Sequence, residues 1–120
     1  MILLVEDNEA NQLLASSVLE LSGYSVEVAG DANEAREILS RQIPDLILMD
    51  IQLPGLDGLS FVKELRAESA TAAIPVVALT ALAMAGDRER SLAAGCNGYI
   101  SKPIDTRTFA GEVRKYLPAS

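Results

Sequence analysis

Five short apolar runs, separated by longer segments that mix apolar and polar residues, constrain the fold of this chain most strongly. The runs predict strands at residues 2–5, 25–29, 45–49, 75–79 and 98–101. Strands that are apolar throughout are typical of parallel sheets buried on both faces, with right-handed helical crossovers between the strands. We therefore expect an α/β fold: a doubly wound parallel sheet with five helices.

The segments between the strands carry signals for helix starts and helix ends. Asn8 is a candidate N-cap, and Asp31 with Glu34 forms a capping-box pattern. Gly23 and Gly95 stand where glycines commonly end helices. The expected helices cover residues 8–21, 31–41, 58–68 and 84–94, followed by a last helix that Asp105 or Thr106 caps and that ends before Pro118.

Apolar residues make up 49% of the chain, which is sufficient for a single core. A length of 120 residues is that of one ordinary domain. The sequence shows no linker, internal repeat or low-complexity stretch, so we expect one domain over residues 1–120. The first helix is expected to have an apolar stripe made of Leu13, Leu14, Val18, Leu19 and Leu21.

Charge and composition argue against several classes of function. The formal net charge of −7 disfavours nucleic acid and anionic membrane surfaces as direct partners. No window holds the roughly 20 apolar residues of a membrane span, and the apolar start runs at once into Glu6 and Asp7, unlike a signal peptide. The single cysteine, Cys96, permits no internal disulfide. A cytoplasmic location is the expectation.

The chain contains no histidine. It therefore cannot carry phosphohistidine, and it cannot use imidazole as a general base or as a metal ligand. Histidine-based catalytic triads and zinc sites are excluded for the same reason. Its chemistry must come from carboxylates, hydroxyls and lysine.

Reactive side chains follow four of the five expected strands. Glu6 and Asp7 follow the first strand, Asp50 the third, Thr80 the fourth and Lys102 the fifth. In open α/β sheets, ligands bind beyond the carboxyl ends of the strands, where the strand order reverses. With the order 2-1-3-4-5, the first and third strands are neighbours at that point, and the three carboxylates would converge in one cleft.

Three carboxylates in one cleft repel one another, and a hard divalent cation removes that conflict. Mg²⁺ suits oxygen ligands and often completes its shell with water and phosphate oxygens, so the cluster predicts Mg²⁺ and, through it, a phosphoryl group. A carboxylate can itself act as the nucleophile and form an acyl phosphate. Lys102 and the Thr80 hydroxyl are then suited to two of the phosphoryl oxygens.

Four motifs contain these residues: Leu-Val-Glu-Asp-Asn at 4–8, Leu-Met-Asp-Ile-Gln-Leu-Pro-Gly-Leu-Asp-Gly at 48–58, Ala-Leu-Thr-Ala at 78–81 and Gly-Tyr-Ile-Ser-Lys-Pro at 98–103. In order and spacing they resemble the motif set of response regulator receiver domains, and the resemblance covers the whole chain. Residues 79–105 look most like single-domain regulators of the DivK type and the receivers of hybrid histidine kinases. The resemblance implies a flavodoxin-like (βα)5 fold.

The resemblance also implies a role for each site residue. Asp50 matches the phospho-acceptor, Asp7 a direct Mg²⁺ ligand, and Glu6 a partner that acts largely through water. Glu6 departs from the commonest pattern, where Asp is frequent at this position. The other matches are the backbone carbonyl of Gln52 as a metal ligand, Thr80, Ala81 and Lys102 as phosphate contacts, Thr80 and Tyr99 as the switch pair, and Lys102–Pro103 as a cis peptide bond.

Partners follow from the same resemblance. The phosphoryl donor is expected to be a histidine kinase or a histidine phosphotransfer protein. The output face is expected on the fourth helix, fifth strand and fifth helix, where a downstream protein binds once Thr80 has moved and Tyr99 has turned inward. We expect a monomer or a phosphorylation-dependent dimer. The docking face for the donor is expected at Asn11, Leu14, Ala15, Pro103 and Ile104, although Leu14 and Ile104 fit a core role equally well.

Gln52 and Leu82 occupy the positions that tune water access to the acyl phosphate in this family. Because Gln52 is long enough to hydrogen-bond or block an attacking water, we expect slow autodephosphorylation. Apart from its own phosphoryl transfer and dephosphorylation, the chain is not expected to be an enzyme.

Three other interpretations of the sequence are possible. A phosphatase of the haloacid-dehalogenase type also uses an Asp nucleophile and Mg²⁺, but it resembles a pattern with a second Asp where this chain has Gln52. A flavodoxin-like cofactor module would need a Ser/Thr/Gly-rich phosphate loop, whereas the first strand is followed by acidic residues. An interaction module that has lost phosphorylation is disfavoured by the complete set of reactive residues.

Overall fold

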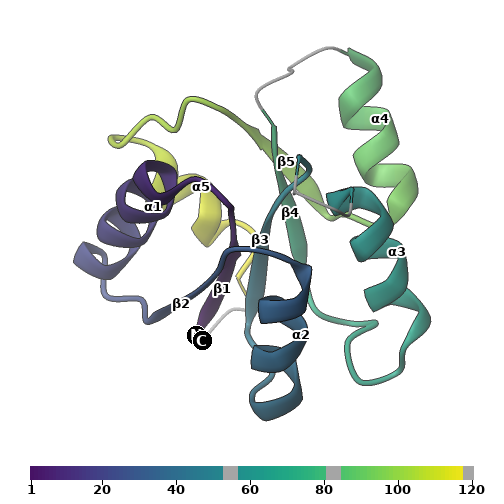
Figure 1. Ribbon diagram of the computed structural model, residues 1–120. Helices are drawn as coiled ribbons and strands as arrows, with labels where there is room; N and C mark the ends of the chain where they lie inside the picture. Colours follow the sequence, from purple (N-terminus) through teal and green to yellow (C-terminus); the bar gives the residue numbers. More distant parts are fainter. Residues whose placement is uncertain (53–56, 81–84, 118–120) are drawn as a thin grey trace.

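The five apolar runs form one parallel sheet in the computed structural model, which describes residues 1–52, 57–80 and 85–117 (Figure 1). The strand order β2-β1-β3-β4-β5 confirms the predicted topology, and each neighbouring pair is parallel. The strands are β1 (Ile2–Val5), β2 (Val26–Ala29), β3 (Leu46–Asp50), β4 (Val76–Thr80) and β5 (Gly98–Ser101). The helices are α1 (Glu9–Leu21), α2 (Ala32–Arg41), α3 (Gly58–Ala67), α4 (Ala85–Ala94) and α5 (Phe109–Arg114).

Helices cover both faces of this sheet, with α1 and α5 on one face and α2, α3 and α4 on the other (Figure 1). Successive side chains of a strand point to opposite faces, so each strand contributes to both cores. In β1, Leu3 and Val5 pack on the α2, α3 and α4 side, whereas Ile2 and Leu4 pack on the α1 and α5 side. Every residue of β1 and β4 is buried, because helices cover both faces of these strands. This two-sided burial explains why their sequences are apolar runs and do not alternate with polar residues.

Most of the predicted helix boundaries are confirmed by their hydrogen bonds. Asn8 Oδ1 accepts from the N–H of Asn11 at 3.0 Å. Asp31 Oδ1 accepts from the N–H of Glu34 at 2.8 Å, but the Glu34 carboxylate accepts from the N–H of Gly30, one residue earlier than a capping box requires. Gly23 and Gly95 have φ angles of +95° and +114°, the left-handed region that favours glycine at a helix end.

The last helix begins later than predicted. The Asp105 carboxylate accepts from the N–H of Arg107 at 2.9 Å, and the Asp105 carbonyl accepts from the N–H of Phe109 at 2.9 Å. Residues 106–108 therefore form a turn, and regular helix begins only at Phe109. Asp105 caps this turn instead of the helix itself, because its side chain is satisfied two residues along the chain.

The prediction of one apolar stripe on α1 is wrong in part. Leu13, Leu14 and Leu21 are 69%, 39% and 89% exposed, and only Ala15 and Leu19 of this helix are buried. Consecutive helical residues point about 100° apart, so adjacent leucines cannot both face a narrow contact with the sheet. The leucine-rich sequence of α1 consequently leaves an apolar surface facing solvent.

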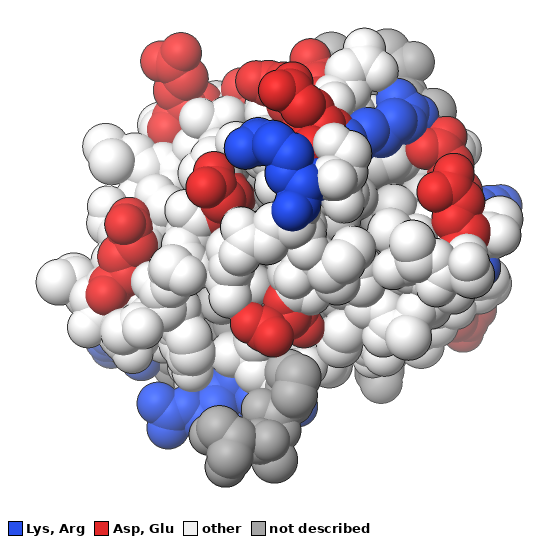
Figure 2. Space-filling view, turned by 90° about the horizontal axis from the view of Figure 1, so that it is seen from below, with Lys and Arg blue, Asp and Glu red and all other residues white. Residues whose placement is uncertain are grey.

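Charged side chains lie scattered over the face shown in Figure 2. Acidic groups are spread among uncharged ones, and basic side chains form separate small groups between them. Across the described residues, no helix is both long enough and apolar enough to pass through a membrane.

Candidate functional site

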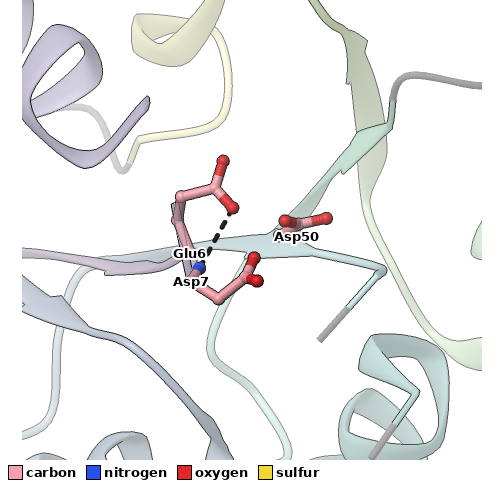
Figure 3. Close-up of side chains that lie close together, drawn as sticks. All are labelled: Glu6, Asp7 and Asp50. Atoms are coloured by element: carbon pink, nitrogen blue, oxygen red, sulfur yellow. Dashed lines mark hydrogen bonds between the residues drawn. The ribbon is translucent and has the colours of Figure 1, made fainter. Parts of the chain in front are cut away.

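Three carboxylates gather at the carboxyl edge of the sheet, as Figure 3 shows for Glu6, Asp7 and Asp50. Each offers one oxygen, and the three oxygens lie within 4.8 Å of one another. Glu6 and Asp7 directly follow β1, and Asp50 is the last residue of β3. Because β1 and β3 are adjacent, the predicted convergence at the point of strand-order reversal is confirmed.

Lys102 reaches two of these carboxylates from the end of β5. Its Nζ lies 2.6 Å from Oε1 of Glu6 and 3.1 Å from Oδ2 of Asp50. The backbone of Lys102 is held at the same edge, since its N–H donates to the Thr80 carbonyl at 2.7 Å. Glu6 and Asp50 are only 1% and 4% exposed, so the ammonium neutralises negative charge that water reaches poorly.

Burial and charge shift the pKa values of Glu6 and Lys102. Burial, together with the neighbouring Asp50 carboxyl, raises the pKa of Glu6 to about 7, even though Lys102 acts in the opposite direction. Burial alone would lower the pKa of Lys102, but its hydrogen bonds to Glu6 and Asp50 outweigh burial and raise that pKa. The site therefore holds a protonated lysine beside a carboxyl group that titrates near neutral pH.

Backbone and side-chain contacts fix the acidic pair after β1. The N–H of Glu6 donates to the Ala29 carbonyl at 2.9 Å, which extends the pairing of β1 with β2 by one residue. The Gln12 side-chain amide, on α1, donates to the Glu6 carbonyl. The N–H of Asp7 donates to Oε2 of Glu6 at 3.1 Å, the dashed line of Figure 3. The Asp7 side chain is exposed to solvent, whereas the Glu6 side chain is buried at the base of the site.

The loop after β3 holds the Asp50 side chain in place. Oδ1 of Asp50 accepts from the N–H of Gln52 at 2.9 Å, and the N–H of Ile51 donates to the Leu79 carbonyl at 3.2 Å. The start of α3 comes so close that a Cβ on Gly58 would lie 2.4 Å from the Asp50 carbonyl oxygen and 2.6 Å from the Ile51 Cα. Only glycine fits this position, because both contacts are to backbone.

The donor set of the cluster suits Mg²⁺. It offers only carboxylate oxygens, and no nitrogen or sulfur ligand belongs to the group. The exposure of Asp7 leaves room for water in the metal shell, which Mg²⁺ usually retains. Glu6, Asp7 and Asp50 are therefore the residues that would hold the ion.

The remaining predicted site residues lie around this cluster. Thr80 ends β4 and is buried, and Tyr99 lies in the middle of β5, half-buried. The Lys102–Pro103 peptide bond is cis, as expected. Gln52 is exposed and its N–H contacts Asp50, while a metal-ligand role for its carbonyl stays a prediction. Ala81 and Leu82 fall outside the described residues.

Comparison with known proteins assigns the chain to a family. A model of the response regulator receiver domain matches residues 2–114. The chain belongs to the response regulator receiver family. Its flavodoxin-like topology, with CheY-like structural neighbours, agrees with this assignment.

Relatives of this receiver domain include regulators and kinase receivers. The polar-differentiation response regulator DivK of Brucella anthropi is 44% identical over 116 residues, which are 97% of this chain and 94% of that protein. The receiver domain of sensor histidine kinase PA1611 from Pseudomonas aeruginosa, solved with a magnesium ion in its active-site cleft, is 42% identical, with a TM-score of 0.86 over 96% of this chain and 94% of that one. The chemotaxis response regulator CheY4 of Vibrio cholerae is 28% identical, with a TM-score of 0.90 over 97% of each chain.

The residues predicted to dock a phosphoryl donor differ in their accessibility on this receiver. Leu14 and Pro103 are exposed, and Asn11 is half-buried. Ile104 is half-buried and packs on the core beneath α1 and α5. Ala15 is only 1% exposed, so its predicted contact with a partner is wrong: it faces the sheet, one turn before the buried Leu19.

Two residues that shape the receiver site are absent from the sequence predictions. Gln12 supports Glu6 from a neighbouring helix, and Gly58 permits the close approach of α3 to Asp50. The Asp-Gly pair at 57–58 signals only a turn in the sequence. The sequence around Gln12 likewise does not indicate that its side-chain amide donates to the Glu6 carbonyl in the preceding loop.

Proposed function

We propose that Asp50 accepts a phosphoryl group from a phosphohistidine on another protein, and that Glu6, Asp7 and Asp50 hold the Mg²⁺ this requires. The observation that carries the proposal is the position of the Lys102 ammonium, 2.6 Å from Glu6 and 3.1 Å from Asp50. A nucleophilic carboxylate, a cation for the phosphoryl oxygens and a set of metal-binding carboxylates thus share one edge of the sheet.

In the transfer, a carboxylate oxygen of Asp50 forms a bond to phosphorus while the bond from phosphorus to the donor's imidazole nitrogen breaks. The imidazole leaves with the electron pair of that bond and takes a proton. The Lys102 ammonium lies next to the Asp50 carboxylate, so it is close enough to neutralise negative charge on the transferred phosphoryl group. The bound Mg²⁺ would supply further positive charge for the phosphoryl oxygens.

The donor must be a separate protein, because this chain has no histidine. A histidine kinase or a histidine phosphotransfer protein is the proposed donor, docking at the exposed part of the predicted face, with Leu14 and Pro103. Phosphorylation would then draw the Thr80 hydroxyl toward the new oxygens and turn Tyr99 inward, changing the face formed by α4, β5 and α5 for a downstream protein. Beyond this transfer and a slow autodephosphorylation limited by Gln52, we propose no turnover of other substrates.

The direct test is mass spectrometry after incubation with acetyl phosphate and Mg²⁺. The wild type is expected to gain one phosphoryl group and Asp50→Asn none. Asp45→Asn is the matched control, since it makes the same change at the opposite end of the β3 region, where Asp45 is exposed. Equal labelling of the wild type and Asp50→Asn would place the acceptor elsewhere and overturn the proposal.

A phosphatase of the haloacid-dehalogenase type makes a different prediction. Such an enzyme would hydrolyse phosphate esters with steady turnover. The receiver is expected to incorporate one phosphoryl group and then stop. Release of many equivalents of phosphate per chain, lost in Asp50→Asn, would favour the phosphatase.

A further inference from the structure

The peptide unit between Glu6 and Asp7 is held by a hydrogen bond at each of its two polar atoms. Its oxygen, the Glu6 carbonyl, accepts from the side-chain amide of Gln12. Its N–H, which belongs to Asp7, donates to Oε2 of Glu6 at 3.1 Å (Figure 3). Because a peptide unit is planar, two hydrogen bonds on opposite sides fix the orientation of the whole plane. The position of the Asp7 Cα follows from that orientation, since this atom lies in the same plane.

Gln12 reaches this peptide unit from a helix that is itself held in place. The N–H of Gln12 donates to the Asn8 carbonyl at 2.9 Å in the first turn of α1. The same helix packs on the sheet through the buried residues Ala15 and Leu19. A Cβ on Gly30 would lie 3.8 Å from the Gln12 amide nitrogen, so this amide also lies beside the loop that precedes α2. The Gln12 amide therefore has a rigid support next to the acidic pair.

The second hydrogen bond of the peptide unit depends on a carboxylate that has other partners. Oε1 of Glu6 lies 2.6 Å from the Lys102 ammonium, and the same carboxylate belongs to the group that would hold a metal ion. A carboxylate that turns toward a cation changes its contact with the Asp7 N–H. The amide nitrogen of Gln12 is a donor only and has no affinity for a cation. Its hydrogen bond to the Glu6 carbonyl is therefore the more constant of the two.

We infer that Gln12 is a positioning residue for Asp7: by holding the Glu6 carbonyl, it places the Asp7 carboxylate for a divalent cation. Gln12 acts through the backbone and is not itself a ligand. Loss of a residue that orients a metal ligand typically weakens metal binding by about 10–100-fold, and we expect about tenfold here because Asp7 keeps its carboxylate. The inference rests on the proposed function for the metal at this site, whereas the support of the peptide unit does not depend on it.

The test is isothermal titration calorimetry with Mg²⁺ on the wild type and on Gln12→Met. Methionine has a similar length and a similar helix propensity, but its side chain cannot donate to the Glu6 carbonyl. The affinity for Mg²⁺ is expected to fall about tenfold. Gln42→Met is the matched control, because Gln42 is exposed at the other end of α2, and it should leave the affinity unchanged. Urea denaturation of the metal-free proteins establishes that both variants are folded.

A second measurement separates positioning from a purely structural role. The rate of labelling by acetyl phosphate is followed over a series of Mg²⁺ concentrations. In Gln12→Met, the Mg²⁺ concentration that gives half of the maximal rate should rise about tenfold, while the rate at saturating Mg²⁺ stays within about twofold of the wild type. Asp50 and Lys102 are unchanged in this variant. A fall in the saturated rate without a change in the Mg²⁺ dependence would overturn the inference.

A third measurement needs no metal. The exchange of the Asp7 amide hydrogen, followed by NMR in the metal-free protein, should be about threefold to tenfold faster in Gln12→Met, as expected when one hydrogen bond is lost. Unchanged Mg²⁺ affinity or unchanged Asp7 exchange in this variant would refute the positioning role. Failure of the proposed function gives a different result. A wild type that binds no Mg²⁺ would refute the metal site for both proteins, whereas a wild type that binds Mg²⁺ without labelling at Asp50 would refute the phospho-acceptor alone.

Discussion

Arg66 Nε donates to the Gly95 carbonyl at 2.9 Å, joining the end of α3 to the turn after α4. The same guanidinium donates to the carbonyls of Ala72 and Ile74 at 3.1 and 2.6 Å and to the Asn97 side chain at 3.0 Å. Asn97 in turn accepts from the N–H of Val76 at the start of β4. One side chain of α3 therefore connects the α3–β4 loop to the α4–β5 loop, at the end of the sheet opposite the acidic cluster.

Arg66→Ala is expected to lower the free energy of unfolding by about 2–4 kcal/mol, because it leaves several partly buried carbonyls without their donor. Arg66→Lys should recover little, since an ammonium cannot reach all four acceptors at once. Urea denaturation measures the difference. Arg41→Ala, an exposed arginine at the end of α2, should change stability by less than about 0.5 kcal/mol. Equal losses in the two alanine variants would show that the connections contribute nothing specific.

Gly58→Ala is expected to destabilise the protein by about 3 kcal/mol or more, because the new Cβ would overlap the backbone of Asp50 and Ile51. It should also weaken Mg²⁺ binding, since the loop that carries Asp50 must shift. Gly111→Ala is the matched control on α5, where a Cβ meets no atom within 4 Å. That variant should gain about 0.5–1 kcal/mol from helix propensity. Thermal unfolding and magnesium calorimetry decide between these outcomes.

Lys102→Met is expected to bind Mg²⁺ more tightly than the wild type and yet to accept a phosphoryl group more slowly. The ammonium competes with the metal for Glu6 and Asp50, so its removal favours the metal. The same change removes a charge that stabilises the transferred group, at a cost of about 10²–10³ in rate. Calorimetry with Mg²⁺ and the rate of labelling by acetyl phosphate measure the two effects. Weaker metal binding in the variant would contradict this role of Lys102.

The metal-free protein should lose stability as the pH rises from about 5 to above 7. The pKa of Glu6 is raised from 4.5 to about 7 in the folded protein, so the folded state binds more protons than the unfolded state in this window. The contribution is complete below the unfolded pKa and is lost as the pH rises through the folded one. Glu6→Gln should flatten this part of the profile in urea denaturation. Added Mg²⁺ should stabilise the wild type increasingly toward higher pH, because it binds the ionised carboxylate.

Cys96 is expected to resist alkylation in the folded protein. Its thiol is buried, and burial raises its pKa from 9.0 to about 11. At about pH 8 the thiolate fraction is then roughly 100-fold lower than for a free thiol, before any loss of access is counted. Iodoacetamide labelling followed by mass spectrometry should be slow in buffer and fast in denaturant. Rapid labelling of the native protein would show that Cys96 opens to solvent.

Local patterns in the sequence predicted most of the secondary structure and the residue types that gather at the site. Unbroken apolar runs predict buried parallel strands, and Asn8, Gly23 and Gly95 mark helix ends, because these signals involve residues within one turn of each other. The reactive residues could be assigned to one edge because parallel strands all end on the same side of a sheet. The late start of α5 escaped prediction, since Asp105 can cap a turn or a helix with the same local sequence.

Only the tertiary structure decided which side chains are buried and how the reactive groups meet. Leu13 and Leu21 are exposed because α1 contacts the sheet along a line too narrow for them, and Ala15 faces that line instead of a partner. Lys102 and Glu6 are 96 positions apart in the chain, and their 2.6 Å contact arises because β5 and β1 end at one edge. The raised pKa of Glu6 has the same cause, because its burial and its neighbours Asp50 and Lys102 come from segments that are distant in the sequence.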